Sequence, residues 1–106
     1  MPKFMIKASY SADGLKGLLR EGGSSRRDAV KAAVESAGGS LETFLYGFGD
    51  GDLYVIMDVP DAESAAAISL TIGASGALAP ETIALLTPEQ VDAAVKKNIN
   101  YRAPGA

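Results

Sequence analysis

Apolar and polar residues alternate along several short stretches of the chain, and longer stretches with helical spacing separate them. Residues 3–10 alternate and are rich in strand-forming residues, which is typical of a strand with one buried face. The same pattern predicts strands at Leu41–Phe48, Leu53–Val59 and 76–86. Because Pro80 cannot donate a backbone hydrogen bond, we expect the last of these strands either to lie at an edge of the sheet or to contain a bulge.

Helical patterns fill the segments between these strands. Residues 11–23 predict only a short helical turn, since two glycines weaken it. Residues 24–39 predict a longer helix with an apolar stripe. We expect it to begin with a capping box formed by Ser25 and Asp28.

Two later segments have clear helix starts. Asp61 is a typical N-cap residue for a helix over residues 62–74. A helix over 87–97 begins with Thr87 as the cap, proline at the first helical position, and Gln90 completing a capping box.

The predicted order is β-α-β-β-α-β followed by a C-terminal helix, with residues 98–106 extended or loosely ordered. This order is the ferredoxin-like α+β pattern, in which helices cover one face of a four-stranded sheet. A chain of 106 residues is long enough for one core. We therefore predict a single ferredoxin-like domain over residues 1–106.

A glycine-rich loop with two aspartates, Asp50 and Asp52, separates the second and third strands. Asp50-Gly51 fits a two-residue type I′ turn, in a register that pairs Phe44 with Met57. That register gathers an almost wholly apolar face, formed by Phe44, Tyr46, Phe48, Leu53, Val55, Met57 and Val59. A calcium loop would need further oxygen ligands that the sequence lacks, so a turn is favoured and no metal is expected.

The opposite face of this hairpin is mixed rather than polar. It carries Thr43, Leu45, Gly47, Tyr54, Ile56 and Asp58. Since helices cover only one side of the sheet in this fold, a half-apolar second face needs another cover. We therefore predict a homodimer, or a larger homo-oligomer, that forms through the sheet face.

Composition narrows the possible functions. The chain has neither cysteine nor histidine, which excludes thiolate chemistry and removes the most common general base and haem ligand. Its net charge of −3 disfavours a nucleic-acid partner, and no apolar run approaches the ~20 residues of a membrane span. Flavin and nicotinamide fingerprints are also missing, so we expect a cytoplasmic protein without a cofactor.

The segment EGGSSRR, residues 21–27, brings glycines, two serines and two arginines to a helix start. A helix N-terminus favours an anion, and Arg26 and Arg27 are suited to binding a carboxylate or phosphate. The alternative, which we favour, is an ordinary helix start whose arginines pair with acids such as Glu21 or Asp28.

Lys7 and Asp58 should both lie on the sheet face that the helices leave open. A charged pair there is either a proton-transfer pair with shifted pKa values or, as we favour, a structural ion pair. Tyr10 at a strand end and Tyr54 on the mixed face can each give a pocket an apolar wall and a hydroxyl. Tyr46 is expected in the core.

Three segments carry a resemblance to a known family: ASYSADGLKGLLREGGSSRRDAVKAAVESAGG, FGDGDLYVIMDVPD and SGALAPETIALLTPEQVDAAV. Nearly end to end, the chain resembles the GYD domain family of small bacterial proteins, which implies the dimeric α+β barrel form of the ferredoxin-like fold. The family's Gly-Tyr-Asp signature corresponds to residues 49–52, where Gly51 replaces the tyrosine. The wider superfamily includes cofactor-free monooxygenases, small-lactone isomerases, haem-degrading and haem-peroxidase proteins and ligand binders, so the resemblance implies a fold rather than one reaction.

These observations leave three functions open. The leading one is a homodimeric module that binds a small aromatic or carboxylate-bearing molecule or serves in assembly. The second is a cofactor-independent monooxygenase, isomerase or lyase in which Tyr10, Lys7 and Asp58 act on the substrate. The third is a structural protein without a pocket. A cavity lined by tyrosine, lysine or arginine would favour the first two.

Overall fold

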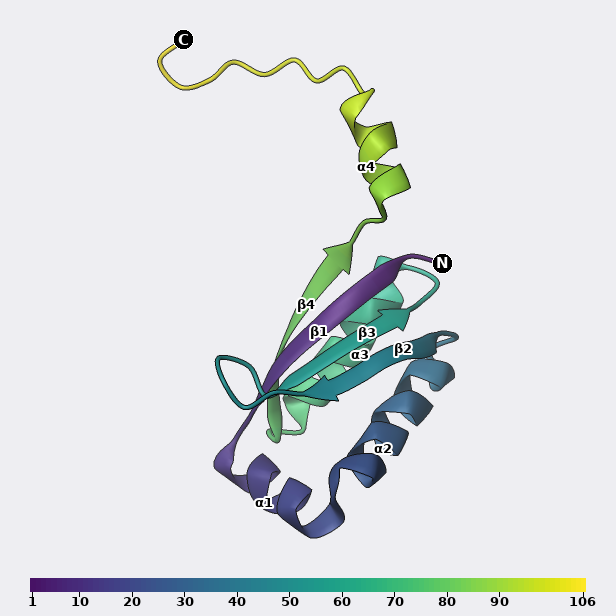
Figure 1. Cartoon of the computed structure of the whole chain (residues 1–106), viewed down its shortest axis with the longest axis vertical. Coiled ribbons are helices and arrows are strands. Elements are labelled where there is room, and N and C mark those ends of the chain that lie inside the picture. The colour runs from purple at the N-terminus through teal and green to yellow at the C-terminus, as the bar shows by residue number, and fades with distance from the viewer.

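Four strands and four helices make up the structure, a computed structural model that describes residues 1–106 (Figure 1). Every predicted strand and helix is present, with its bounds shifted by a few residues, but the short helical turn predicted within residues 11–23 is a ten-residue helix. In chain order the elements are β1 (Lys3–Tyr10), α1 (Ala12–Glu21), α2 (Gly23–Ser36), β2 (Ser40–Tyr46), β3 (Leu53–Asp58), α3 (Ala62–Ala74), β4 (Leu78–Leu85) and α4 (Pro88–Val95).

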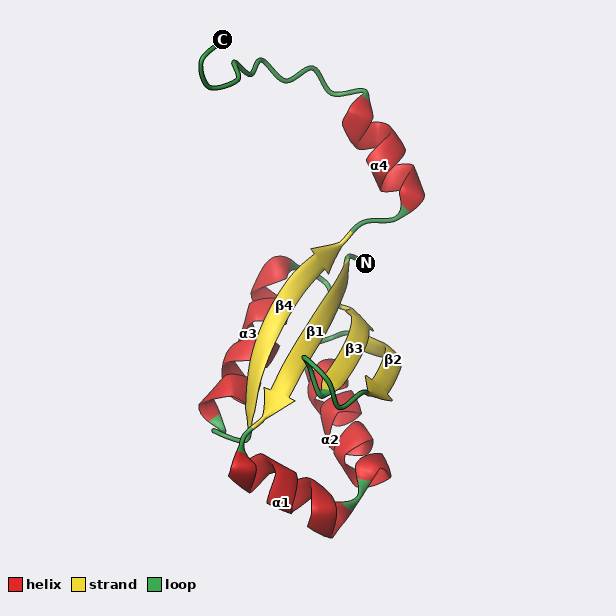
Figure 2. Cartoon of the chain, turned by 60° about the vertical axis from the view of Figure 1, so that its left-hand side comes forward, coloured by secondary structure: helices red, strands yellow, loops and turns green.

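The strands form one antiparallel sheet in the order β2-β3-β1-β4. Helices α2 and α3 pack on one face of this sheet, and the other face is uncovered (Figure 2). This is the ferredoxin-like α+β arrangement, so the predicted fold class is confirmed. β4 lies at an edge, as the proline at position 80 predicted.

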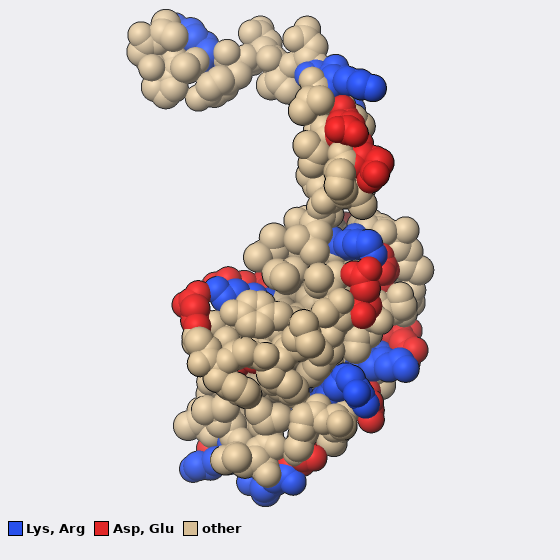
Figure 3. All heavy atoms as spheres, viewed as in Figure 1, with Lys and Arg blue, Asp and Glu red and all other residues tan.

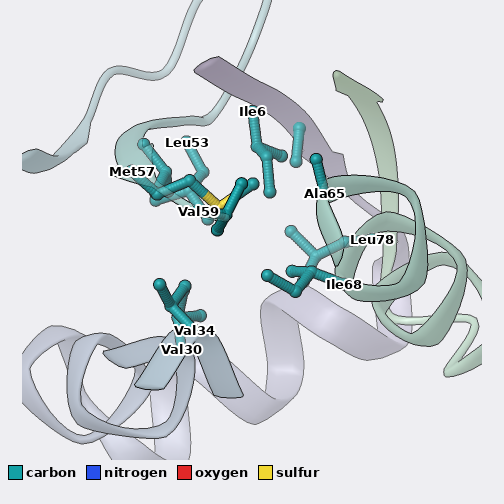
Figure 4. Close-up of a cluster of buried hydrophobic side chains, with 11 residues drawn as sticks. Ile6, Val30, Val34, Leu53, Met57, Val59, Ala65, Ile68 and Leu78 are labelled. Carbon is teal, nitrogen blue, oxygen red and sulfur yellow. The ribbon is translucent and has the colours of Figure 1, made fainter. Parts of the chain in front are cut away.

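The core lies between the sheet and these two helices. Ile6 of β1 and Met57 of β3 are at most 1% exposed. Figure 4 shows Val34 of α2 and Ile68 of α3 among the side chains that gather with them. Because full burial of one aliphatic side chain contributes about 1.5–3 kcal/mol, this layer holds α2 and α3 on the sheet.

The loop between β2 and β3 differs from the predicted two-residue turn. Phe44 pairs with Val55 rather than Met57, so the register is shifted by two residues and the loop spans residues 47–52. Because the shift is even, the predicted apolar side chains of the two strands still share one face. Gly51 does not have a positive φ, so the predicted type I′ turn is wrong.

Two contacts with β1 explain this wider loop. The backbone N–H of Asp52 donates to the carbonyl of Ala8 (2.9 Å), and its carboxylate accepts from the backbone N–H of Tyr10 (2.9 Å). Gly51 is buried beside it, where a Cβ atom would lie 2.8 Å from Cε of Lys7. No unusual φ requires glycine at this position, and a larger residue there would have to displace the flexible side chain of Lys7.

The predicted helix starts were right for two helices and wrong for one. The caps predicted for α3 (Asp61) and α4 (Thr87) are both present. The capping box predicted from Ser25 and Asp28 is wrong, because α2 begins earlier, at Gly23, with no side-chain cap. A left-handed glycine between α1 and α2 (φ 82°) lets the second helix follow the first directly.

Helix α4 lies outside the two layers. It continues from the end of β4 and, with the residues that follow it, extends away from the sheet (Figures 1 and 2). None of its residues is buried. No helix of the chain combines the length and the apolar character that crossing a membrane requires.

Candidate functional site

A cleft of about 240 Å³ lies at the end of β1, next to α1. Its walls come from the end of β1, from α1, from the first turn of α2 and from the segment before β4. The lining residues include Tyr10, Gly14, Gly17, Leu18, Glu21 and Arg26. Two of the predicted site residues, Tyr10 and Arg26, therefore come together here.

The sequence of α1 explains why this helix borders an open cleft. The hydroxyl of Ser11 accepts from the N–H of Gly14 (3.0 Å), and the backbone N–H of Ser11 donates to the carbonyl of Ala77 (2.9 Å). Gly14 is the one buried residue of α1, and a Cβ atom there would lie 2.1 Å from that carbonyl oxygen. At Gly17, nothing lies within 4 Å of such an atom, so this position leaves the cleft open.

Opposite charges meet at the rim of the cleft. Nη1 of Arg26 lies 3.7 Å from a carboxylate oxygen of Glu21, which is attractive but longer than a hydrogen bond. Arg27 instead points to Asp28, at 3.1 Å, and is half-exposed. The predicted pairing of the two arginines with neighbouring acids is confirmed, and only Arg26 lines the cleft. Asp13 adds a second carboxylate to the lining.

A second cavity of about 230 Å³ shares Leu18 with the first. Its other lining residues are Gly23, Tyr46 and Phe48. The rings of Tyr46 and Phe48 are stacked, with centroids 6.1 Å apart and planes within 10° of parallel. Because Phe48 lies outside the ladder and is 71% exposed, this cavity has an aromatic wall that a ligand can reach.

Tyr46 is held as a neutral hydrogen-bond donor. Its hydroxyl donates to the carbonyl of Gly23 (3.1 Å), and its ring packs against the core, as predicted. Burial raises the pKa of Tyr46 to about 12, with a smaller contribution from the neighbouring Tyr10. A phenol with so high a pKa is a poor general base at neutral pH, so Tyr46 serves as a wall and an anchor for α2.

Lys7 and Tyr54 form a separate group on the uncovered face of the sheet. They are register partners on β1 and β3, and Lys7 makes an ion pair with Asp50 from the loop between β2 and β3. This hydrogen-bonded contact raises the pKa of Lys7 and lowers the pKa of Asp50. Both predicted residues therefore lie on the opposite side of the sheet from Tyr10.

The predicted pairing of Lys7 with Asp58 is wrong. Asp58 lies opposite Lys3 in the ladder, and Nζ of Lys3 is 3.0 Å from Asp58 and 3.1 Å from Glu42. Lys7 is four residues further along β1, or about 13 Å at the rise of a strand. Tyr10, Lys7 and Asp58 thus occupy three separate places, and a single small substrate cannot contact all three within one chain.

Sequence reasoning did not identify the contribution of α1. A weak helix was predicted there because of its glycines, although the i, i+3 spacing of Gly14 and Gly17 places both on one helix face. That spacing was the available indication of a concave surface. The residues of α1 missed in this way are Asp13, Gly14, Gly17 and Leu18.

The GYD domain family profile matches residues 4–95 of the chain. Because this match covers most of the 106 residues, the chain belongs to the GYD domain family. No curated protein and no solved structure matches the chain.

Proposed function

We propose that this member of the GYD domain family is a homodimer that binds a small aromatic molecule carrying one carboxylate. The observation that carries the proposal is the convergence of Tyr10, Leu18 and Arg26 on one cleft at the end of β1, beside α1. The aromatic ring and the aliphatic side chain suit the ring of such a ligand, and the guanidinium suits its carboxylate.

The size and charge of the cleft narrow the ligand class. An apolar cavity of about 150 Å³ can hold benzene, so 240 Å³ accommodates one ring with a small substituent. Arg26 lines the cleft, and a guanidinium can donate two hydrogen bonds to one carboxylate. Asp13 and Glu21 lie around the same cleft, and their negative charges disfavour a ligand with several anionic groups.

The uncovered sheet face supports the proposed dimer. Met5, Ile56 and Ile83 are neighbours across β3, β1 and β4 and form an apolar band in the middle of this face. Figure 3 shows a central area without charged side chains and charged groups around its margin. An apolar band of this kind on a sheet calls for a cover, and the same face of a second copy provides one.

Ligand-observed NMR of the full chain with benzoate as the probe tests the binding proposal. We expect benzoate to bind, and benzyl alcohol to bind at least about tenfold more weakly, because it lacks the charge that Arg26 recognises. Gly17→Phe should abolish binding by filling the cleft. Gly17→Ala is the matched control, since one methyl group fits in the open space. If Gly17→Phe binds benzoate as well as the parent chain does, the cleft is not the site.

The dimer is tested by the Ile56→Lys variant, with Ala32→Lys as a control on an exposed position of α2. A lysine in the middle of the apolar band should weaken the dimer and raise the Kd of association, as measured by light scattering during gel filtration at several concentrations. Ala32→Lys should leave the mass unchanged. An unchanged dimer in Ile56→Lys would show that this face is not the interface.

A further inference from the structure

Residues 86–106, here called the C-terminal arm, carry apolar side chains that are left largely exposed in the single chain. No residue of α4 within the arm is buried. The large apolar residues of the arm are 46–76% exposed, namely Leu86, Val91, Val95, Ile99 and Tyr101. A cluster of exposed apolar side chains of this size marks a binding surface.

The surface area indicates how much of the molecule lacks a cover. The chain exposes 6903 Å², whereas a compact monomer of 10.9 kDa exposes about 5,600 Å². Its radius of gyration is 16.7 Å, against about 13 Å for a compact domain of this length. The excess of about 1,300 Å² is larger than the roughly 800 Å² that each partner buries in a stable dimer.

The connection between β4 and α4 directs the arm away from its own domain. Only Leu86 and Thr87 separate the two elements. Thr87 is extended (φ −74°, ψ 160°) and caps α4, and the following Pro88 disfavours a helical conformation at Thr87. No glycine lies in this connection, so the chain leaves β4 in an extended conformation and α4 begins away from its own sheet.

An open groove of about 420 Å³ lies between α3 and β4. Phe4, which lines it, pairs with Ala84 one residue before the end of β4, so the groove lies beside the start of the arm. Its small side chains allow a second helix to approach closely. The hydroxyl of Thr82, also in the lining, is buried without a hydrogen-bond partner in the chain. The remaining walls are formed by Ala62, Ala65, Ala66, Ser69 and Leu70.

We propose that the C-terminal arm of one copy packs in the α3–β4 groove of a second copy, which places its own arm in the first. Because arm and groove lie at the same end of the molecule, a single two-fold axis satisfies both contacts. Val91 and Val95 are four residues apart on one face of α4 and provide the apolar ridge that enters the groove. The exchange requires neither the ligand cleft nor pairing of the uncovered sheet faces.

Cross-linking of the full chain distinguishes exchange between copies from folding back within one copy. The chain has no cysteine, so single cysteines report unambiguously. A Val95→Cys chain is mixed with an Ala66→Cys chain that carries a tag of different mass, and a short bismaleimide is added. We expect a linked pair of unequal chains. Val95→Cys mixed with Ala32→Cys, on α2, should give none.

Two results would overturn the exchange. One is the absence of the linked pair in the first mixture, whatever else the arm binds. The other is a double variant, Val95→Cys with Ala66→Cys, that links only within single chains.

A second measurement does not depend on cysteines. In sedimentation velocity over a range of concentrations, Val91→Asp with Val95→Asp should raise the Kd of association at least about tenfold, because two apolar side chains lose their burial. Both positions are exposed in the single chain, so its circular dichroism spectrum should not change. Unchanged association would overturn the proposal.

Discussion

Gly14 and Gly17 occupy one face of α1, yet replacing each with alanine should have opposite effects on stability. Alanine is more favourable than glycine in a helix by about 0.8–1.0 kcal/mol, and this gain applies at both positions. At Gly17 nothing lies within 4 Å of the added methyl group. We therefore expect Gly17→Ala to stabilise the protein by about 1 kcal/mol.

At Gly14 the added methyl group meets backbone. It would lie 2.1 Å from the carbonyl oxygen of Ala77 and 3.0 Å from the ring of Tyr10. Because a backbone carbonyl cannot rotate aside, α1 must move and weaken the hydrogen bond from Ser11 to Ala77. Overpacking costs about 1–3 kcal/mol and the hydrogen bond about 1 kcal/mol. The gain in helix propensity of about 0.8–1.0 kcal/mol is subtracted from these costs. We therefore expect Gly14→Ala to destabilise the protein by about 1–3 kcal/mol.

Urea unfolding followed by circular dichroism, at one protein concentration, measures both variants. The two midpoints should move in opposite directions from that of the parent. In thermal unfolding each kcal/mol corresponds to a shift of about 4 °C or more. If both variants shift the midpoint in the same direction by similar amounts, the close contact between α1 and the segment before β4 is refuted.

Three further predictions concern other parts of the fold. Tyr46, with its pKa of about 12, contributes stability that is fully present below pH 10 and is lost as the pH rises toward 12; Tyr46→Phe should remove the latest step of the absorbance titration at 295 nm. The pKa of Asp61 is lowered by its hydrogen bonds to Ser64, so Asp61→Ala should lower the free energy of unfolding at pH 7. If this free energy still differs between variant and parent well below pH 3.8, the prediction is contradicted. At Gly39 a Cβ atom would lie 2.3 Å from a backbone oxygen, so Gly39→Ala should cost at least about 1–3 kcal/mol in urea unfolding; a neutral result would rule out that contact.

Alternation along the strands was sufficient to predict the sheet and its buried face. It remained sufficient where the predicted register of β2 with β3 was wrong. A shift of two residues keeps Phe44 and Val55 on the same face of the sheet. The shape of the loop was not predictable in this way. It depends on Asp52 bonding to β1, a contact between residues far apart in the sequence.

The candidate site was predicted only in part, for a related reason. Tyr10 and Arg26 were identified from a strand end and a helix start, which are local features. The partner of Lys7 depends on the register between β1 and β3, and no local pattern specifies that register. The role of Gly17 depends on empty space, which arises only when the helix has docked.

The loop of residues 47–52 reaches both sides of the sheet. Its Asp52 holds the backbone of Tyr10, whose side chain lines the cleft, while its Asp50 binds Lys7 on the uncovered face. A shift of this short segment therefore acts on the cleft and on the uncovered face together. We therefore expect a molecule that displaces Tyr10 and a copy that covers Lys7 to influence each other through this loop, and linkage requires each to change the affinity of the other by the same factor.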